Sequence, residues 1–141
     1  MTEHQQLPHL IVLQKMWFIS LIFSMIKNYL TAVKQRQESS HGGTGAVDLY
    51  EIWGRSDFTS DVDFIDRVVV PPGSKIGFHQ HGENEEMYIV LEGSGLMNIE
   101  DGEVTVSKGD MILNPAGGRH GLVNNSAENI DLLVIQINVD E

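Results

Sequence analysis

The stretch of residues 73–93 constrains the fold of this chain more than any other, because it sets two histidines and a carboxylate at short, fixed spacings. His79 and His81 are two residues apart, and side chains at that spacing leave the same face of a β-strand about 6–7 Å apart. Two such imidazoles can lean onto one metal ion. The residues between His81 and Glu86 suit a turn, so we expect Glu86 to return to the same ion on an adjacent strand.

A second stretch, residues 109–124, adds His120 as a fourth candidate ligand. Singly, each histidine would more often be a surface or structural residue. Burying the four side chains together without an ion would leave polar groups unpaired, at about 1–3 kcal/mol each. Three imidazoles and a carboxylate suit Mn, Fe, Co, Ni, Cu or Zn. We therefore predict that one divalent metal ion binds to His79, His81, Glu86 and His120.

The spacings of both stretches resemble the two motifs of the cupin family. The positions that match the first motif are Gly73, His79, His81, Glu86 and Gly93. Those that match the second are Gly109, Pro115, Gly117, His120 and Asn124. The resemblance implies an all-β fold, a single small antiparallel cupin β-barrel of the double-stranded β-helix or jelly-roll type. It also implies one metal held by three His and one Glu, and a homodimer paired through its sheets.

The residue pattern after position 46 predicts strands and turns without any helical periodicity. The expected strands are residues 47–53, 62–70, 87–91, 96–99, 104–107, 111–113, 120–124 and 130–139. In the first of them, alternation places Val47, Leu49, Glu51 and Trp53 on one face. We expect a hairpin through Gly93-Ser94 and a tight turn at Asp101-Gly102. Residues 47–141 should form the single cupin domain.

Residues 1–46 form a predicted helical or disordered N-terminal extension that ends in a Gly-rich linker. Its apolar run, Leu10–Ile26, is shorter than the about 20 residues of a membrane span. It could be an interfacial helix, a signal or anchor, or an upstream extension of a protein whose synthesis starts at Met16 or Met25. We favour the last, and expect residues 1–24 to be dispensable and the protein to be cytoplasmic. Residues 34–46 are expected to be a flexible lead-in, with His41 solvated.

Charge and composition exclude several classes of function. The formal charge is −11, and the acidic residues concentrate after residue 36, so the body of the protein should repel nucleic acids. Membrane binding is not expected. The absence of cysteine excludes a thiolate metal site and a cysteine nucleophile.

The function that the resemblance and the ligand set favour is a metal-dependent oxidoreductase or isomerase. It would act on a small oxygenated molecule by dioxygen-dependent oxidation, or by metal-assisted isomerisation or epimerisation. Tyr88 shares the inward face of its strand with Glu86 and is a candidate to bond the substrate, although a core tyrosine fits the pattern equally well. The alternative is a non-catalytic module that binds or senses a small sugar or organic acid. A further titratable side chain in the cavity would favour catalysis, and an apolar cavity would favour binding.

Overall fold

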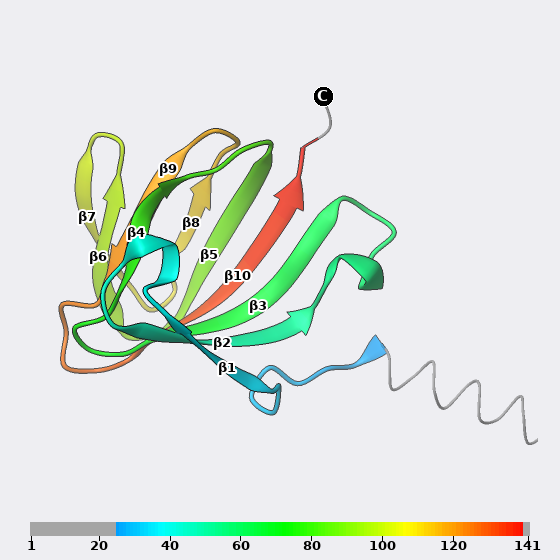
Figure 1. The fold of residues 1–141 in the computed structure, drawn as a ribbon, viewed down its shortest axis with the longest axis horizontal. Coiled ribbons are helices and arrows are strands. Elements are labelled where there is room, and N and C mark those ends of the chain that lie inside the picture. Colours follow the sequence, from blue (N-terminus) through cyan, green and yellow to red (C-terminus); the bar gives the residue numbers. More distant parts are fainter. Residues whose placement is uncertain (1–24, 140–141) are drawn as a thin grey trace, which may run out of the picture.

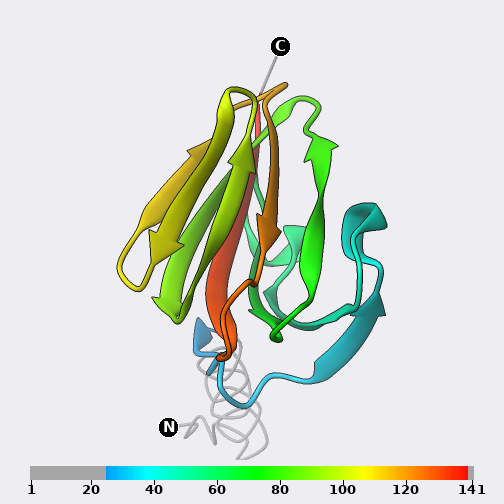
Figure 2. The same cartoon turned by 90° about the vertical axis from the view of Figure 1, so that its left-hand side faces the viewer.

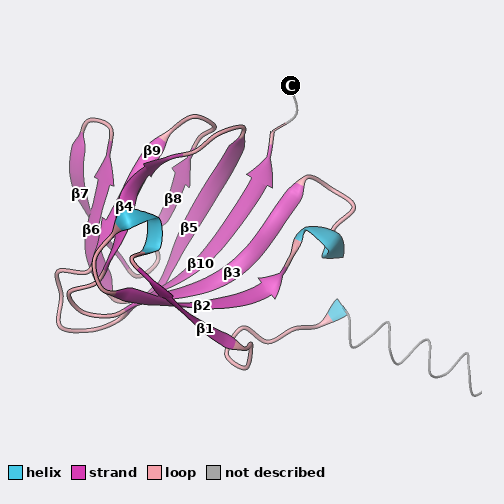
Figure 3. Ribbon diagram, viewed as in Figure 1, coloured by secondary structure: helices cyan, strands magenta, loops and turns pink. Residues whose placement is uncertain are grey.

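The structure, a computed structural model, describes residues 25–139 and consists of two antiparallel β-sheets packed face to face (Figure 1). The six-stranded sheet, in spatial order, contains β1 (Lys34–Glu38), β2 (Ala46–Trp53), β3 (Val62–Val70), β10 (Ile130–Asn138), β5 (Asn84–Glu92) and β8 (Met111–Asn114). The four-stranded sheet contains β4 (Lys75–Gln80), β9 (Arg119–Val123), β6 (Ser94–Ile99) and β7 (Gly102–Ser107). Two short 3-10 turns connect strands, η1 (Ser40–Gly42) between β1 and β2 and η2 (Arg55–Asp57) between β2 and β3 (Figure 3).

The predicted all-β class is correct, but the described strands do not close into a barrel. Pairing within each sheet is continuous, and no pairing joins one sheet to the other over residues 25–139. Figure 2 looks onto the four-stranded sheet, with the six-stranded sheet behind it. The space between the two layers holds the core and, at one end, the candidate site.

The core follows the alternation of each strand. On β5, Tyr88 and Val90 are buried together with Glu86, as their shared parity predicts. The other sheet contributes Met97 and Leu122, which are fully buried. Apolar side chains from the two inner faces therefore meet in one cluster, and their burial supplies most of the stabilisation of the sandwich.

The predicted hairpin through Gly93-Ser94 is wrong. Strand β5 pairs with β10 and β8, whereas β6 pairs with β7 and β9, so the chain crosses from one sheet to the other at Gly93. Gly93 has φ +84°, and a Cβ there would overlap the carbonyl oxygen of Asn129. A local turn signal cannot distinguish a hairpin from a crossing between layers. The tight turn at Asp101-Gly102 does join paired strands, β6 and β7, as expected.

The predicted face of β2 holds only for part of the strand. A bulge interrupts the β2–β3 register between Glu51 and Trp53. Ile52, the extra residue of the bulge, is buried, while Glu51 before it is exposed. An extra residue on one strand reverses the alternation that follows it, so the single face expected over residues 47–53 is not maintained.

The predicted flexible lead-in over residues 34–46 is also wrong. Strand β1 pairs along β2, and the backbone N–H of Lys75 donates a 3.0 Å hydrogen bond to the carbonyl oxygen of Thr44. Gly43 and Gly77 pass so closely that a Cβ on either would overlap backbone atoms of the other segment. Turn η1 is thereby fixed against β4 (Figure 2), and His41, expected to be solvated, stacks on His79 with ring centroids 3.7 Å apart.

The predictions for Leu10–Ile26 and for dispensable residues 1–24 concern a segment that lies almost entirely outside the described residues. Within residues 25–139, no helix has the length and apolar character needed to cross a membrane. The domain boundary at residue 47 stays a prediction.

Candidate metal centre

The four predicted ligands come together at one point between the sheets. The Nε2 atoms of His79 and His81 are 3.2 Å apart, and those of His81 and His120 are 3.1 Å apart. Glu86 Oε1 lies 3.0 Å from His120 Nε2 and 3.5 Å from His81 Nε2. Neighbouring ligands about 2.1 Å from an ion are separated by about 3.0–3.4 Å. We call these four residues the histidine–glutamate cluster, and their spacing fits the surroundings of one metal ion.

Both sheets build this cluster. His79 on β4 lies directly opposite His120 on β9 in the register of the four-stranded sheet. His81 follows the end of β4, where its backbone N–H donates to the carbonyl oxygen of Gly118 at 2.9 Å. Glu86 is on β5 of the six-stranded sheet, so the expectation that it returns on a strand adjacent to the histidines is wrong. It reaches the histidines across the space between the layers.

The neighbouring residue Glu85 does not compete for the site. Glu86 is only 7% exposed, whereas Glu85 is less buried and has the opposite parity on β5. The prediction of Glu86 as the ligand therefore agrees with the direction of its side chain on β5.

Hydrogen bonds behind two of the rings hold them in a ligating orientation. His79 Nδ1 lies 2.8 Å from the carbonyl oxygen of Gly77, and His81 Nδ1 lies 2.7 Å from Oδ1 of Asn84. Because both partners are acceptors, each Nδ1 carries the proton and each Nε2 presents its lone pair to the cluster. Asn84, which lies between His81 and Glu86 where we expected only a turn, thus fixes the orientation of the His81 ring.

The electrostatics of the cluster also suit a cation. Burial lowers the pKa of His79 to about 4, so this imidazole is neutral at physiological pH, as a ligand must be. Burial pushes the pKa of Glu86 upward, but hydrogen bonding and charge interaction with His120 and the other histidines outweigh it and hold that pKa below its usual value. Glu86 Oε1 is buried without a well-formed hydrogen bond, and a metal ion would satisfy it.

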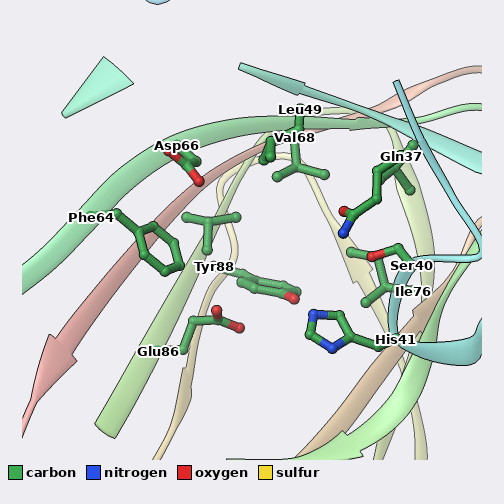
Figure 4. A pocket seen from close by; sticks show the side chains of 12 residues that line it. Gln37, Ser40, His41, Leu49, Phe64, Asp66, Val68, Ile76, Glu86 and Tyr88 are labelled. Carbon is green, nitrogen blue, oxygen red and sulfur yellow. The ribbon is translucent and has the colours of Figure 1, made fainter. Parts of the chain in front are cut away.

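A cavity of about 180 Å³ borders the cluster (Figure 4). Its walls come from β1, η1 and the inner faces of several strands, and the lining residues are Gln37, Ser40, His41, Val47, Leu49, Phe64, Asp66, Val68, Ile76, Glu86, Tyr88 and Val134. Tyr88 lies on this wall, with its ring centroid 4.8 Å from that of His120. Burial raises the pKa of Tyr88 well above its usual value, so the phenol keeps its proton and remains a donor.

Two cavity residues, His41 and Asp66, were missed at the sequence level. Asp66 is 8% exposed, and burial, with the nearby Glu51, raises its pKa to about 6. A signal for it existed, because Asp66 has the same parity on β3 as the buried Val68 and Val70. His41 had no such signal, since only the close passage of η1 along β4 brings it to the site.

Comparison with known proteins decides the family. The sequence profile of the Cupin domain matches residues 66–136, half of the chain, and this region contains all four residues of the histidine–glutamate cluster. The chain belongs to the cupin family.

Several known proteins are similar to this chain in sequence or in structure. An oxalate-binding protein of Thermotoga maritima is 25% identical over 103 residues, which cover 73% of this chain and 85% of that protein. A solved structure named as a predicted oxalate decarboxylase of Thermotoga maritima aligns with a TM-score of 0.79 at 23% identity, over 82% of this chain and 100% of that one. The polyketide cyclase RemF of Streptomyces resistomycificus aligns with a TM-score of 0.64 at 20% identity, over 82% and 85% of the two chains. These structural likenesses show a shared fold.

Proposed function

We propose that this cupin is a metal-dependent enzyme that acts on a small oxygenated molecule, with one divalent ion held by His79, His81, Glu86 and His120. The observation that carries the proposal is the convergence of three Nε2 atoms and one carboxylate oxygen at the edge of a cavity of about 180 Å³. When bound, an ion with this ligand set supplies a Lewis acid that polarises a carbonyl or carboxylate, or a centre that activates dioxygen. Mn, Fe, Co, Ni, Cu and Zn all suit the ligands.

Catalysis is favoured over passive binding because the cavity contains titratable groups besides the ligands. Asp66 presents a buried carboxylate that can take up or return a proton near neutral pH. Tyr88 presents a protonated phenol that can donate to a substrate oxygen, the substrate-bonding role we propose for it. Such groups serve a proton transfer in isomerisation or epimerisation more directly than they serve simple binding, and they are compatible with oxidation.

Binding of a small organic acid without catalysis is the second candidate. It is supported by the names of two similar proteins, an oxalate-binding protein and a predicted oxalate decarboxylase. The apolar part of the cavity wall, which includes Phe64 and Val68, would suit either function.

We also propose that the protein forms a homodimer through the outer face of the six-stranded sheet. Met111 and Leu113 on β8 are 63% and 56% exposed, and their cross-strand partners Ile89 and Met87 extend the same apolar face on β5. An apolar face of this kind on a sheet is typical of an interface between protein chains. Leu113→Asp should convert a dimer to a monomer in light scattering, while a wild type that is already monomeric would contradict the proposal.

The experiment that tests the proposed function is metal analysis of the purified protein, combined with a screen of small hydroxy, keto and carboxylic acids with and without dioxygen. Turnover that requires both metal and dioxygen identifies an oxidase or oxygenase. Turnover that requires metal alone identifies an isomerase or epimerase. Saturable binding without turnover supports the second candidate, and a protein that takes up no divalent ion refutes the metal centre.

A further inference from the structure

We propose that Asp66 selects ligands by charge, so that the cavity accepts small hydroxy or carbonyl compounds with an uncharged far end and rejects dicarboxylates. The inference rests on the proposed function in one respect: it takes the oxygen-bearing end of the ligand to lie at the histidine–glutamate cluster. The new element is the set of cavity groups that the rest of the ligand contacts.

The position of Asp66 makes it a cavity group rather than a surface charge. It lies in the middle of β3, is 8% exposed, and lines the same cavity as Glu86 and Tyr88. Its Oδ1 atom is buried without a hydrogen-bond partner. Figure 4 shows the carboxyl groups of Asp66 and Glu86 at different edges of the cavity, both directed inward. A ligand that starts at Glu86 and fills the cavity therefore also comes against Asp66 with another part of the molecule.

Within residues 25–139, no cation is paired with this carboxylate. Among the described residues that line the cavity there is no lysine or arginine. Arg67, next to Asp66 in sequence, has the opposite parity on β3 and binds both carboxylate oxygens of Asp131, at 2.8 and 2.6 Å. The cavity imidazole of His41 stacks on His79 and lies across the cavity from Asp66 in Figure 4, so it does not pair with this carboxylate.

The other charged groups that act on Asp66 are also acidic, from three strands: Glu51 on β2, Asp63 on β3 and Glu86 on β5. A second carboxylate on the ligand would therefore meet a like charge in a water-poor site, without a compensating cation. A hydroxyl group at the same position would instead donate a hydrogen bond to the carboxylate of Asp66. The apolar walls, which include Phe64 and Val134, offer a carboxylate no other partner.

The test compares acids that differ only in the far group, using protein loaded with one equivalent of Mn²⁺ at pH 8, where Asp66 is ionised. Titration calorimetry measures the Kd of 3-hydroxypropionate against malonate, and of 4-hydroxybutyrate against succinate. We expect the wild type to bind each hydroxy acid at least about tenfold more tightly than its dicarboxylate partner. In Asp66→Asn the preference should fall below about threefold, mainly because the dicarboxylates bind better.

Asp61→Asn is the matched control, because it removes the same charge at an exposed residue just before β3 that neither lines the cavity nor is among the acidic groups acting on Asp66. It should keep the wild-type preference, and Asp66→Ser provides a second neutral variant should the asparagine variant be poorly folded. Equal binding of both members of a pair, no binding of any of the four acids, or an unchanged preference in both Asp66 variants would overturn the proposal. A wild type that takes up no Mn²⁺ would instead refute the metal centre, which the metal content of each sample reports separately.

Discussion

The two sheets contribute different chemistry to the same site. The four-stranded sheet and the loop after β4 supply the three imidazoles, and the six-stranded sheet supplies the carboxylates of Glu86 and Asp66 and the phenol of Tyr88. His79 and His120 are cross-strand partners, so the register of β4 and β9 sets their relative position. Glu86 reaches them only because the two layers pack at the correct distance. The histidine half of the site, His79, His81 and His120, thus depends on strand pairing. The half that carries oxygen groups, Glu86, Asp66 and Tyr88, depends on how the two sheets pack.

Removing a ligand from either half is expected to have the largest effect. His120→Ala should lower metal affinity and turnover by about tenfold or more, because the remaining ligands cannot hold the ion in its position. Glu86→Gln should cost less, because an amide oxygen can still ligate without the charge. Metal content after dialysis, measured alongside thermal melting, distinguishes lost ligation from lost folding. If the His120→Ala protein keeps its metal and full turnover, the ion does not depend on this half of the site.

Acid should act with opposite sign on His79 and on Asp66 in the metal-free protein. The pKa of His79 is lowered from 6.5 to about 4, so its stabilising contribution is present above pH 6.5 and is lost as the pH falls towards 4. The pKa of Asp66 is raised from 3.8 to about 6, so the penalty for its ionisation is relieved over nearly the same range. Asp66→Asn removes the second contribution only. Its Tm should therefore fall more steeply than that of the wild type between pH 6.5 and 4.

Melting curves of chelator-treated protein from pH 8 to pH 4 provide this measurement, and Asp61→Asn again serves as the control. Parallel curves for the wild type and Asp66→Asn would show that Asp66 is not buried as its place between the sheets requires.

The contact between η1 and β4 should have a smaller effect. His41→Ala removes a ring stacked on His79 and is expected to cost about 1 kcal/mol, a decrease in Tm of about 4 °C, while the metal stays bound. Gln35→Ala, on the exposed strand β1, is the control for general damage to this segment and should be nearly neutral. If His41→Ala loses as much metal as His120→Ala, then His41 is needed to hold the metal ion, contrary to this prediction.

The smallest effect is expected from removing the first 24 residues. A chain that starts at Met25 keeps both sheets and all four residues of the histidine–glutamate cluster. Its metal stoichiometry should equal that of the full chain, and its Tm should differ by no more than about 2 °C. An insoluble or metal-free product would mean that the segment around Leu10–Ile26 stabilises the sandwich, contrary to our expectation.

Local periodicity in the sequence was sufficient to predict much of this molecule. Alternation over two residues placed Glu86, Tyr88 and Val90 on one face, because the side-chain direction in a strand depends only on position along it. The motif spacings selected the four residues that meet in the cluster. The same alternation on β3 would have indicated Asp66 as an inward carboxylate.

Only the tertiary structure decided which sheet each strand joins and what covers the site. The crossing at Gly93 and the placement of Glu86 opposite the histidines depend on pairing between strands far apart in sequence, which no local pattern encodes. The same is true of His41, whose segment has the composition of a flexible linker. It is ordered because Gly43 and Gly77 allow two backbones to pass in direct contact, a fit that exists only once both segments are folded.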